Sequence, residues 1–187
     1  IGIRLAAAAI LIGILFTVTM LFFVNHNPGK TSQLANDLLP GTNKAILTLA
    51  NGRHLNLSDA TNGQVYQQQG VKIVKAQSGQ VIFDYSGTET TAEQNTITTP
   101  NGGQWQIKLP DGSQVWLNAA SSLTFPTSFT HGINRIVKLS GEGYFEVAND
   151  ATHPFIVISG YQRVEVLGTH FNISSYADDP SVKTTLL

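Results

Sequence analysis

A glycine followed directly by a threonine, Gly168-Thr169, is the stretch of this sequence whose residue types and position suggest a chemical step. A threonine hydroxyl can attack the carbonyl carbon of the residue before it when the backbone there is strained. The amide then becomes an ester, which water cuts. Glycine at the preceding position leaves the carbonyl sterically open. The hypothesis that follows is a single self-cleavage by an N-to-O acyl shift, with Thr169 as the nucleophile.

The Gly-Thr pair coincides with a break in the alternation of apolar residues. Val164 and Val166 place their side chains on one face of an expected strand, whereas Phe171 and Ile173 fall in the opposite phase. Because strand side chains alternate, a shift by one residue moves all later side chains to the other face. A β-bulge, which inserts one extra residue, explains the shift without chemistry. We therefore expect a bulge or a sharp bend at Gly168-Thr169, whether or not the chain is cut there.

Other arrangements of reactive side chains favour structure over catalysis. Glu142 and Glu146 lie on one strand face, about 13 Å apart at about 3.3 Å per residue, and glycosidase carboxylates are only about 5–9.5 Å apart. The five histidines have no zinc-ligand spacing and cysteine is absent. We expect no turnover enzyme, no metal site and no cofactor. Trp105 and Trp116 fit a buried β core better than a sugar platform.

Composition and charge exclude one class of partner. Charged residues make up 12% of the chain, and the formal net charge is −1. Nucleic-acid binding requires a clustered basic surface that neutralises phosphates. The sequence therefore predicts no nucleic-acid partner.

The N-terminal part predicts a membrane anchor. Leu5 to Val24 is a run of twenty residues without a charge, and about twenty apolar residues span a hydrocarbon core of about 30 Å. A buried core helix would ordinarily show a polar face. A signal peptide has an apolar region of about 7–15 residues and ends in small residues, whereas this run ends in Phe22-Phe23-Val24. We predict a transmembrane helix within residues 1–24 and a linker over residues 25–43.

Residues 44–187 have the pattern of an all-β domain. Short runs of β-branched and aromatic residues alternate with turn pairs such as Asn51-Gly52 and Asp111-Gly112. The hairpin patterns of Leu47–Ser58 and Ile107–Asn118 match each other at an offset of sixty residues. Such a repeat favours a winding, solenoid-like architecture or a sandwich of short antiparallel strands. In the strand predicted over Arg135–Val147, alternate residues from Val137 to Val147 form the inner face.

The second half of the chain carries four ordered motifs. They are LPDGSQVWLNAASSLTFPTSF (109–129), LSGEGYFEVAND (139–150), HPFIV (153–157) and VEVLGTHFNISSYADDPSVKTTL (164–186). Together they resemble the FecR family of membrane-anchored anti-sigma factors, in the form common in Bacteroidetes. The resemblance extends over nearly all of residues 44–187.

The resemblance implies a signal transducer. In this family a cytoplasmic segment holds an extracytoplasmic-function sigma factor, one helix crosses the inner membrane, and a periplasmic β region receives a signal from an outer-membrane TonB-dependent receptor. It implies that residues 5–24 span the inner membrane, that residues 25–187 lie in the periplasm, and that the sigma-binding and receptor-contacting segments lie outside these residues. Some members cut themselves at a Gly-Thr bond, which Gly168-Thr169 matches. The alternative is a membrane-tethered β-sheet module that binds a glycan or protein without signalling.

Overall fold

The structure is a computed structural model that describes residues 13–23, 41–68, 70–85, 93–129 and 133–187. The chain divides into two compact units, Ile1–Leu39 and Pro40–Leu187. In the first unit, residues 13–23 form an α-helix. None of the helices within the described ranges is long and apolar enough to cross a membrane. The remainder of the predicted membrane segment, residues 5–12 and Val24, and most of the predicted linker lie outside the described residues.

The second unit is built of strands, which confirms the all-β prediction. Its strands are β1 (Thr42–Asn43), β2 (Ile46–Thr48), β3 (His54–Asn56), β4 (Gly63–Gln68), β5 (Val71–Lys75), β6 (Val81–Tyr85), β7 (Gln94–Thr98), β8 (Gly103–Lys108), β9 (Gln114–Leu117), β10 (Ser122–Pro126), β11 (Arg135–Glu146), β12 (Phe155–Ser159), β13 (Gln162–Val166), β14 (His170–Ser175) and β15 (Lys183–Leu186).

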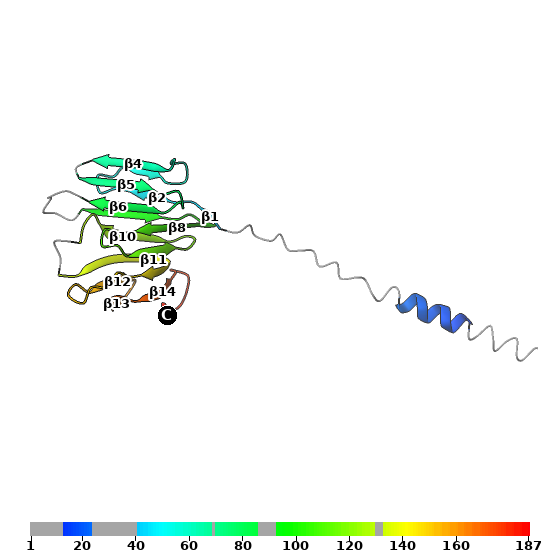
Figure 1. Cartoon of the computed structure of the whole chain (residues 1–187). Coiled ribbons are helices and arrows are strands. Elements are labelled where there is room, and N and C mark those ends of the chain that lie inside the picture. The colour runs from blue at the N-terminus through cyan, green and yellow to red at the C-terminus, as the bar shows by residue number, and fades with distance from the viewer. Residues whose placement is uncertain (1–12, 24–40, 69, 86–92, 130–132) are drawn as a thin grey trace, which may run out of the picture. The chain divides into compact units, whose positions relative to one another are not determined.

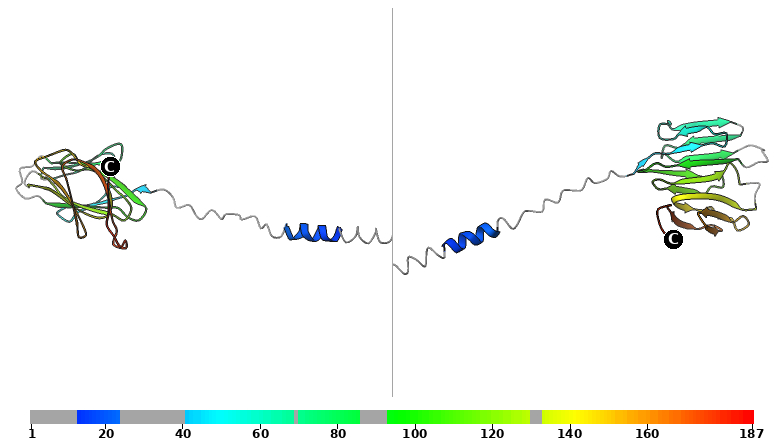
Figure 2. Two further views of the ribbon diagram at one scale, coloured as in Figure 1. Left: turned by 90° about the horizontal axis from the view of Figure 1, so that it is seen from below. Right: turned by 180° about the vertical axis from the view of Figure 1, so that it is seen from behind.

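The strands form one continuous hydrogen-bonded sheet that is folded into two layers. The first layer has the order β3-β2-β7-β10-β11-β12-β13, and the second has the order β4-β5-β6-β8-β9-β11-β14-β15. Both orders nearly follow the chain, so successive segments are added along one direction, from β4 at one end of Figure 1 to β13 and β14 at the other. Figure 2 shows the same stack from below and from behind. The domain is therefore a mostly β-sheet unit whose single sheet curls into a half-barrel.

Strand β11 belongs to both layers and bends at Gly141. Its first half pairs with β10 and β12, and its second half pairs with β9 and β14. Gly141 has a φ of +86°, and a Cβ atom there would lie 2.8 Å from the Cα of Ser121. Glycine is required because any side chain would collide with this backbone. Gly141 thus marks both a bend and a close approach, as glycines in strands do.

Aromatic side chains of the two layers meet in the core. Phe83 of β6 packs edge-on against Phe125 of β10, with ring centroids 4.9 Å apart. Phe145 of β11 stacks on Phe171 of β14 at 5.0 Å and also contacts Phe155 of β12. All five rings are almost fully buried. Burial of such large apolar side chains between layers is the main stabilising contribution expected in a sandwich.

The internal repeat is confirmed in backbone geometry. In the β2–β3 turn, Leu49 N donates to Arg53 O and Gly52 N donates to Leu49 O. The β8–β9 turn has the same pair of bonds, sixty residues later, at Leu109 and Gly112. The β5–β6 turn repeats them a third time at Ala76 and Gly79. One of these turns joins strands of the first layer and two join strands of the second.

Candidate functional site

Gly168-Thr169 lies in the connection between β13 and β14. Strand β13 pairs with β12 in the first layer, whereas β14 pairs with β11 in the second. The expected sharp bend is therefore present, and it separates two strands of different layers instead of placing a bulge within one. The phase of the apolar residues changes because the chain passes from one layer to the other, where the core lies on the opposite side of the strand.

The backbone on both sides of Gly168 is clamped to the segment that follows β11. Val147 N donates a hydrogen bond to Thr169 O at 3.1 Å, and Asp150 N donates one to Leu167 O at 2.8 Å. Between these bonds, a Cβ atom at Gly168 would lie 2.6 Å from the Cα of Asn149. Only glycine fits this close approach. The two hydrogen bonds and the close contact together hold the Gly168–Thr169 peptide bond in place.

The clamping segment is itself held from two directions. Ala148 N donates to Ser113 Oγ at 3.0 Å, and Ala148 O accepts from Arg135 Nη1 at 2.9 Å. Farther along, Asp150 closes a turn by accepting from Thr152 N, Thr152 Oγ1 and His153 N. These bonds to Thr152 and then to His153 lower the pKa of the Asp150 carboxyl well below its ordinary value.

A buried ion pair supports the same region. Arg135 Nη1 lies 2.8 Å from Asp111 Oδ2, with the two side chains 4% and 8% exposed. Asp111 also accepts hydrogen bonds from the backbone and hydroxyl of Ser113, and Arg135 Nε donates to His153 O. Arg135 was missed in the sequence, although it falls in the inner phase of β11. Arg135 can be buried because Asp111, in the β8–β9 turn, neutralises its charge.

Thr169 is half-buried and His170 is exposed. Glu142 and Glu146, which were considered above as a possible catalytic pair, are both half-buried. They therefore do not lie on a fully solvated strand face. No group of three or more His, Asp or Glu side chains in the described ranges could hold a metal ion.

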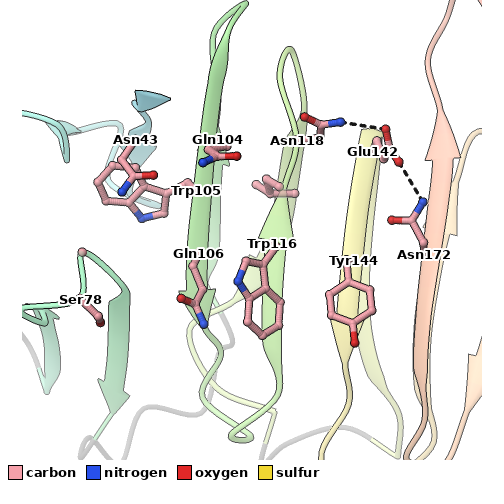
Figure 3. A pocket seen from close by; sticks show the side chains of 12 residues that line it. Asn43, Ser78, Gln104, Trp105, Gln106, Trp116, Asn118, Glu142, Tyr144 and Asn172 are labelled. Carbon is pink, nitrogen blue, oxygen red and sulfur yellow. Dashed lines mark hydrogen bonds between the residues drawn. The ribbon is translucent and has the colours of Figure 1, made fainter. Parts of the chain in front are cut away.

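A groove of about 410 Å³ lies on the outer face of the second layer. We call it the sheet groove and define it by its central lining residues, which are Gln106, Trp116, Asn118, Glu142, Tyr144 and Asn172. Figure 3 shows these side chains arising from neighbouring strands. Trp116 and Tyr144 form a tilted aromatic pair with centroids 5.4 Å apart. This groove was not identified from the sequence. The only sequence pattern that could have indicated it is the alternation in β9 and β11, which places Trp116, Glu142 and Tyr144 on the face away from the core.

The two tryptophans occupy opposite sides of the second layer. Trp105 also borders the groove, but it is only 3% exposed and its ring lies 5.4 Å from Lys75 Nζ. Trp116 is half-buried. The expectation of a buried core aromatic therefore holds for Trp105, and Trp116 belongs to the outer surface.

Partial burial and the neighbouring Glu146 carboxylate raise the pKa of Tyr144 above its ordinary value of 10.0. Tyr144 Oη donates to Glu146 Oε1 at 3.3 Å. The phenol therefore remains protonated at neutral pH.

Comparisons with known proteins agree with the motifs in the second half of the chain. Residues 95–187 match the family described as FecR protein. Two solved structures of a protein from Parabacteroides distasonis ATCC 8503, provisionally assigned as an anti-sigma factor, are each 34% identical, with TM-scores of 0.46 and 0.44. The matches extend over 50% and 49% of this chain and 51% and 50% of those chains, so this chain spans about half their length. No curated protein matches it. Residues 95–187 are therefore similar in sequence to the family described as FecR protein.

Proposed function

We propose that this chain is the membrane-anchored and periplasmic part of a single-pass anti-sigma factor. It would relay a signal from an outer-membrane TonB-dependent receptor to an extracytoplasmic-function sigma factor held by a cytoplasmic segment. The observation that carries the proposal is the FecR-family match over residues 95–187. The ordered motifs of the same region resemble membrane-anchored anti-sigma factors. That resemblance is the reason for proposing that the signal passes from the receptor to the sigma factor.

Two features of the helix over residues 13–23 support a membrane anchor: its exposed apolar side chains and the hydrogen bonds of its threonine hydroxyls. Its large apolar residues are exposed on all sides, from 55% for Ile14 to 71% for Phe23. Thr17 Oγ1 donates to Gly13 O at 3.1 Å, and Thr19 Oγ1 donates to Leu15 O. A helix in hydrocarbon must satisfy its polar groups internally, and these hydroxyls do so. We propose that residues 5–24 span the inner membrane and that residues 25–187 lie in the periplasm.

The last strand offers a surface for the receptor. All four residues of β15 are exposed, and within the described residues β15 pairs only with β14. An edge strand with a free side can accept a further strand from another protein. We propose that Val182–Leu187 leads the chain toward the receptor contact by such pairing.

Self-cleavage at Gly168-Thr169 is a further part of the proposal. Thr169 Oγ1 would attack the Gly168 carbonyl carbon, and the bond between that carbon and Thr169 N would break. The products of this step would be an ester between Gly168 and Thr169 Oγ1 and a free Thr169 amine. Water would then hydrolyse that ester, giving a Gly168 carboxylate and restoring the Thr169 hydroxyl. The clamp formed by Val147, Asn149 and Asp150 supports this step, because it fixes the bond on both sides.

The paired strands would hold the two pieces together after the cut. Strand β14 lies beyond Thr169 and pairs with β11 from Glu146↔His170 to Gly141↔Ser175. Its other side pairs with β15. The C-terminal piece would therefore remain in the second layer through β14 until force or a protease removed it.

Capture of the sigma factor from membranes tests the relay. The full-length protein is purified in detergent from membranes that have been washed with alkaline carbonate. We expect it to remain in the washed membranes and to retain the sigma factor. Ile14→Arg should release protein from the membranes, because a central Arg costs about 2.5–3.5 kcal/mol on insertion, and Ile14→Leu should not. Release of the unaltered protein by the wash would contradict the anchor, and absence of the sigma factor would contradict the relay.

A further inference from the structure

The sheet groove crosses four inner strands of the second layer. Gln106 of β8 lies opposite Trp116 of β9, Trp116 opposite Tyr144 of β11, and Tyr144 opposite Asn172 of β14. These four residues form one continuous row across the outer face of the sheet, which Figure 3 shows. The row places two aromatic rings between two amide side chains.

A second set of polar groups is already organised at one end of the groove. Glu142 Oε2 accepts from Asn118 Nδ2 at 3.0 Å, and Glu142 Oε1 accepts from Asn172 Nδ2 at 2.9 Å. The two amides hold the carboxylate from opposite sides. Each carboxylate oxygen has capacity for a second hydrogen bond. Asn118 Oδ1 already accepts from Ala119 N at 2.8 Å and has one further acceptor position, and the Asn172 amide also carries an oxygen that can accept. The site therefore presents fixed acceptors and donors before any ligand arrives.

We propose that the sheet groove binds a neutral saccharide. A sugar ring has an apolar face of C–H groups, which packs on aromatic rings, and a rim of hydroxyls that both donate and accept hydrogen bonds. Trp116 and Tyr144 supply the aromatic surface. Asn118, Asn172 and Glu142 supply the groups for the hydroxyls. A volume of about 410 Å³ is within the range of small-ligand pockets, about 300–1,000 Å³.

The charge of the lining argues against anionic ligands. Among the described residues that line the groove, Glu142 supplies the one carboxylate, and none is a lysine or an arginine. Phosphate and carboxylate ligands are recognised chiefly by cationic side chains. A phosphorylated, sulfated or uronic-acid ligand would place its charge beside Glu142 without compensation.

The position of the groove argues against an extended peptide. Strand addition requires a sheet edge with free backbone groups. Strands β9 and β11 at the centre of the groove are each paired on both sides. Their backbone groups are already used, so recognition here depends on side chains alone.

Calorimetric titration of the whole chain tests the proposal. The protein is kept in a zwitterionic detergent without a sugar headgroup, which would itself compete for the groove. The probes are malto-, cello-, xylo-, manno- and laminari-hexaose, with hexagalacturonic acid and hexalysine as charged comparisons. We expect at least one neutral hexasaccharide to bind with a Kd below about 1 mM and neither charged probe to bind. Binding should also change tryptophan emission, since Trp116 lies in the groove.

Matched variants assign the binding to the groove. Trp116→Ala and Tyr144→Ala should each weaken the saccharide by about tenfold, as expected for the loss of roughly 1.4 kcal/mol of aromatic contact. Trp116→Phe should keep most of the affinity, because an aromatic ring remains. Retained binding by this variant would show that a change at position 116 does not by itself disrupt the fold. Tyr161→Ala should have no effect, because Tyr161 is 87% exposed outside the groove. The proposal is overturned if no neutral probe binds, if hexalysine or hexagalacturonic acid binds instead, or if Trp116→Ala leaves the affinity unchanged. It stands apart from the signalling proposal, whose tests do not involve saccharides.

Discussion

The carboxylate of Asp111 and the guanidinium of Arg135 are joined by an ion pair of 2.8 Å in which both side chains are almost completely buried. The pair connects the β8–β9 turn to the first residue of β11. Arg135 also donates to the carbonyls of Ala148 and His153, so the same guanidinium holds the segment that clamps Gly168-Thr169. The position of the candidate cleavage bond thus depends on a charge pair in the core.

Removal of one partner of this pair should destabilise the domain strongly. Arg135→Met leaves Asp111 buried without its counter-ion, which costs about 3–5 kcal/mol. Chemical denaturation of the purified protein would measure the free energy of unfolding. The matched control is Arg163→Met, because the Arg163–Glu165 pair is 56% and 44% exposed, and it should cost less than about 1 kcal/mol. Equal effects of the two changes would show that the Asp111–Arg135 pair has no special role.

The bend in β11 should depend on Gly141. Gly141→Ala introduces a strained φ, which costs about 1–2 kcal/mol, and a collision with Ser121, which adds about 1–3 kcal/mol. Gly112→Ala has a similar φ of +88° but meets no atom within 4 Å, so only the strain should remain. Thermal unfolding would compare the two variants. A Gly141→Ala protein as stable as Gly112→Ala would contradict the close approach of the two strands.

Sequence patterns were sufficient for the parts of the fold that local geometry determines. The alternation over Arg135–Val147 correctly predicted that Val137, Leu139, Phe145 and Val147 are buried. The turn glycines Gly52 and Gly112 have the positive φ expected of such turns. These features depend on neighbours within a few residues.

Features that join distant segments could not be predicted in the same way. The parallel pairing of β11 with β12 and the division of strands between two layers depend on long-range contacts. The phase break at Gly168 indicated a bend, but it could not reveal that β13 and β14 lie in different layers. The sheet groove was missed because Gln106, Trp116 and Tyr144 come together only through cross-strand register.

The Asp150 turn should make stability depend on pH in the acid range. Hydrogen bonds from Thr152 and His153 lower the Asp150 pKa in the folded state below its ordinary value of 3.8. The ionised carboxylate therefore contributes stability that is complete above that ordinary value and is lost as pH falls through the lowered one. Asp150→Asn should reduce stability at pH 7, and its difference from the unaltered protein should shrink below about pH 4. A difference that grows as the pH falls would contradict this sign.

Substitutions at the Gly-Thr pair would test self-cleavage by intact mass. Thr169→Ala should leave only the full-length mass, because it removes the attacking hydroxyl, whereas Thr169→Ser should still be cut. Gly168→Ala should slow the reaction, since the added methyl would collide with Asn149. Thr42→Ala is the matched control: Gly41-Thr42 is the same dipeptide, but Thr42 lies in strand β1 and pairs with Gly103. If the unaltered protein shows only its full-length mass after long incubation at neutral pH, Gly168-Thr169 is a structural bend alone.

Transcription from a promoter that depends on the cognate extracytoplasmic-function sigma factor tests the central claim most directly. Cells with the full-length gene, without it, and with a version lacking residues 95–187 would be compared before and after the outer-membrane receptor is given its substrate. We predict that transcription follows the receptor signal only with the full-length gene, because residues 95–187 match the FecR protein family and are the part that receives the signal in the proposed relay. Equal responses to the receptor in all three strains would contradict the proposed function.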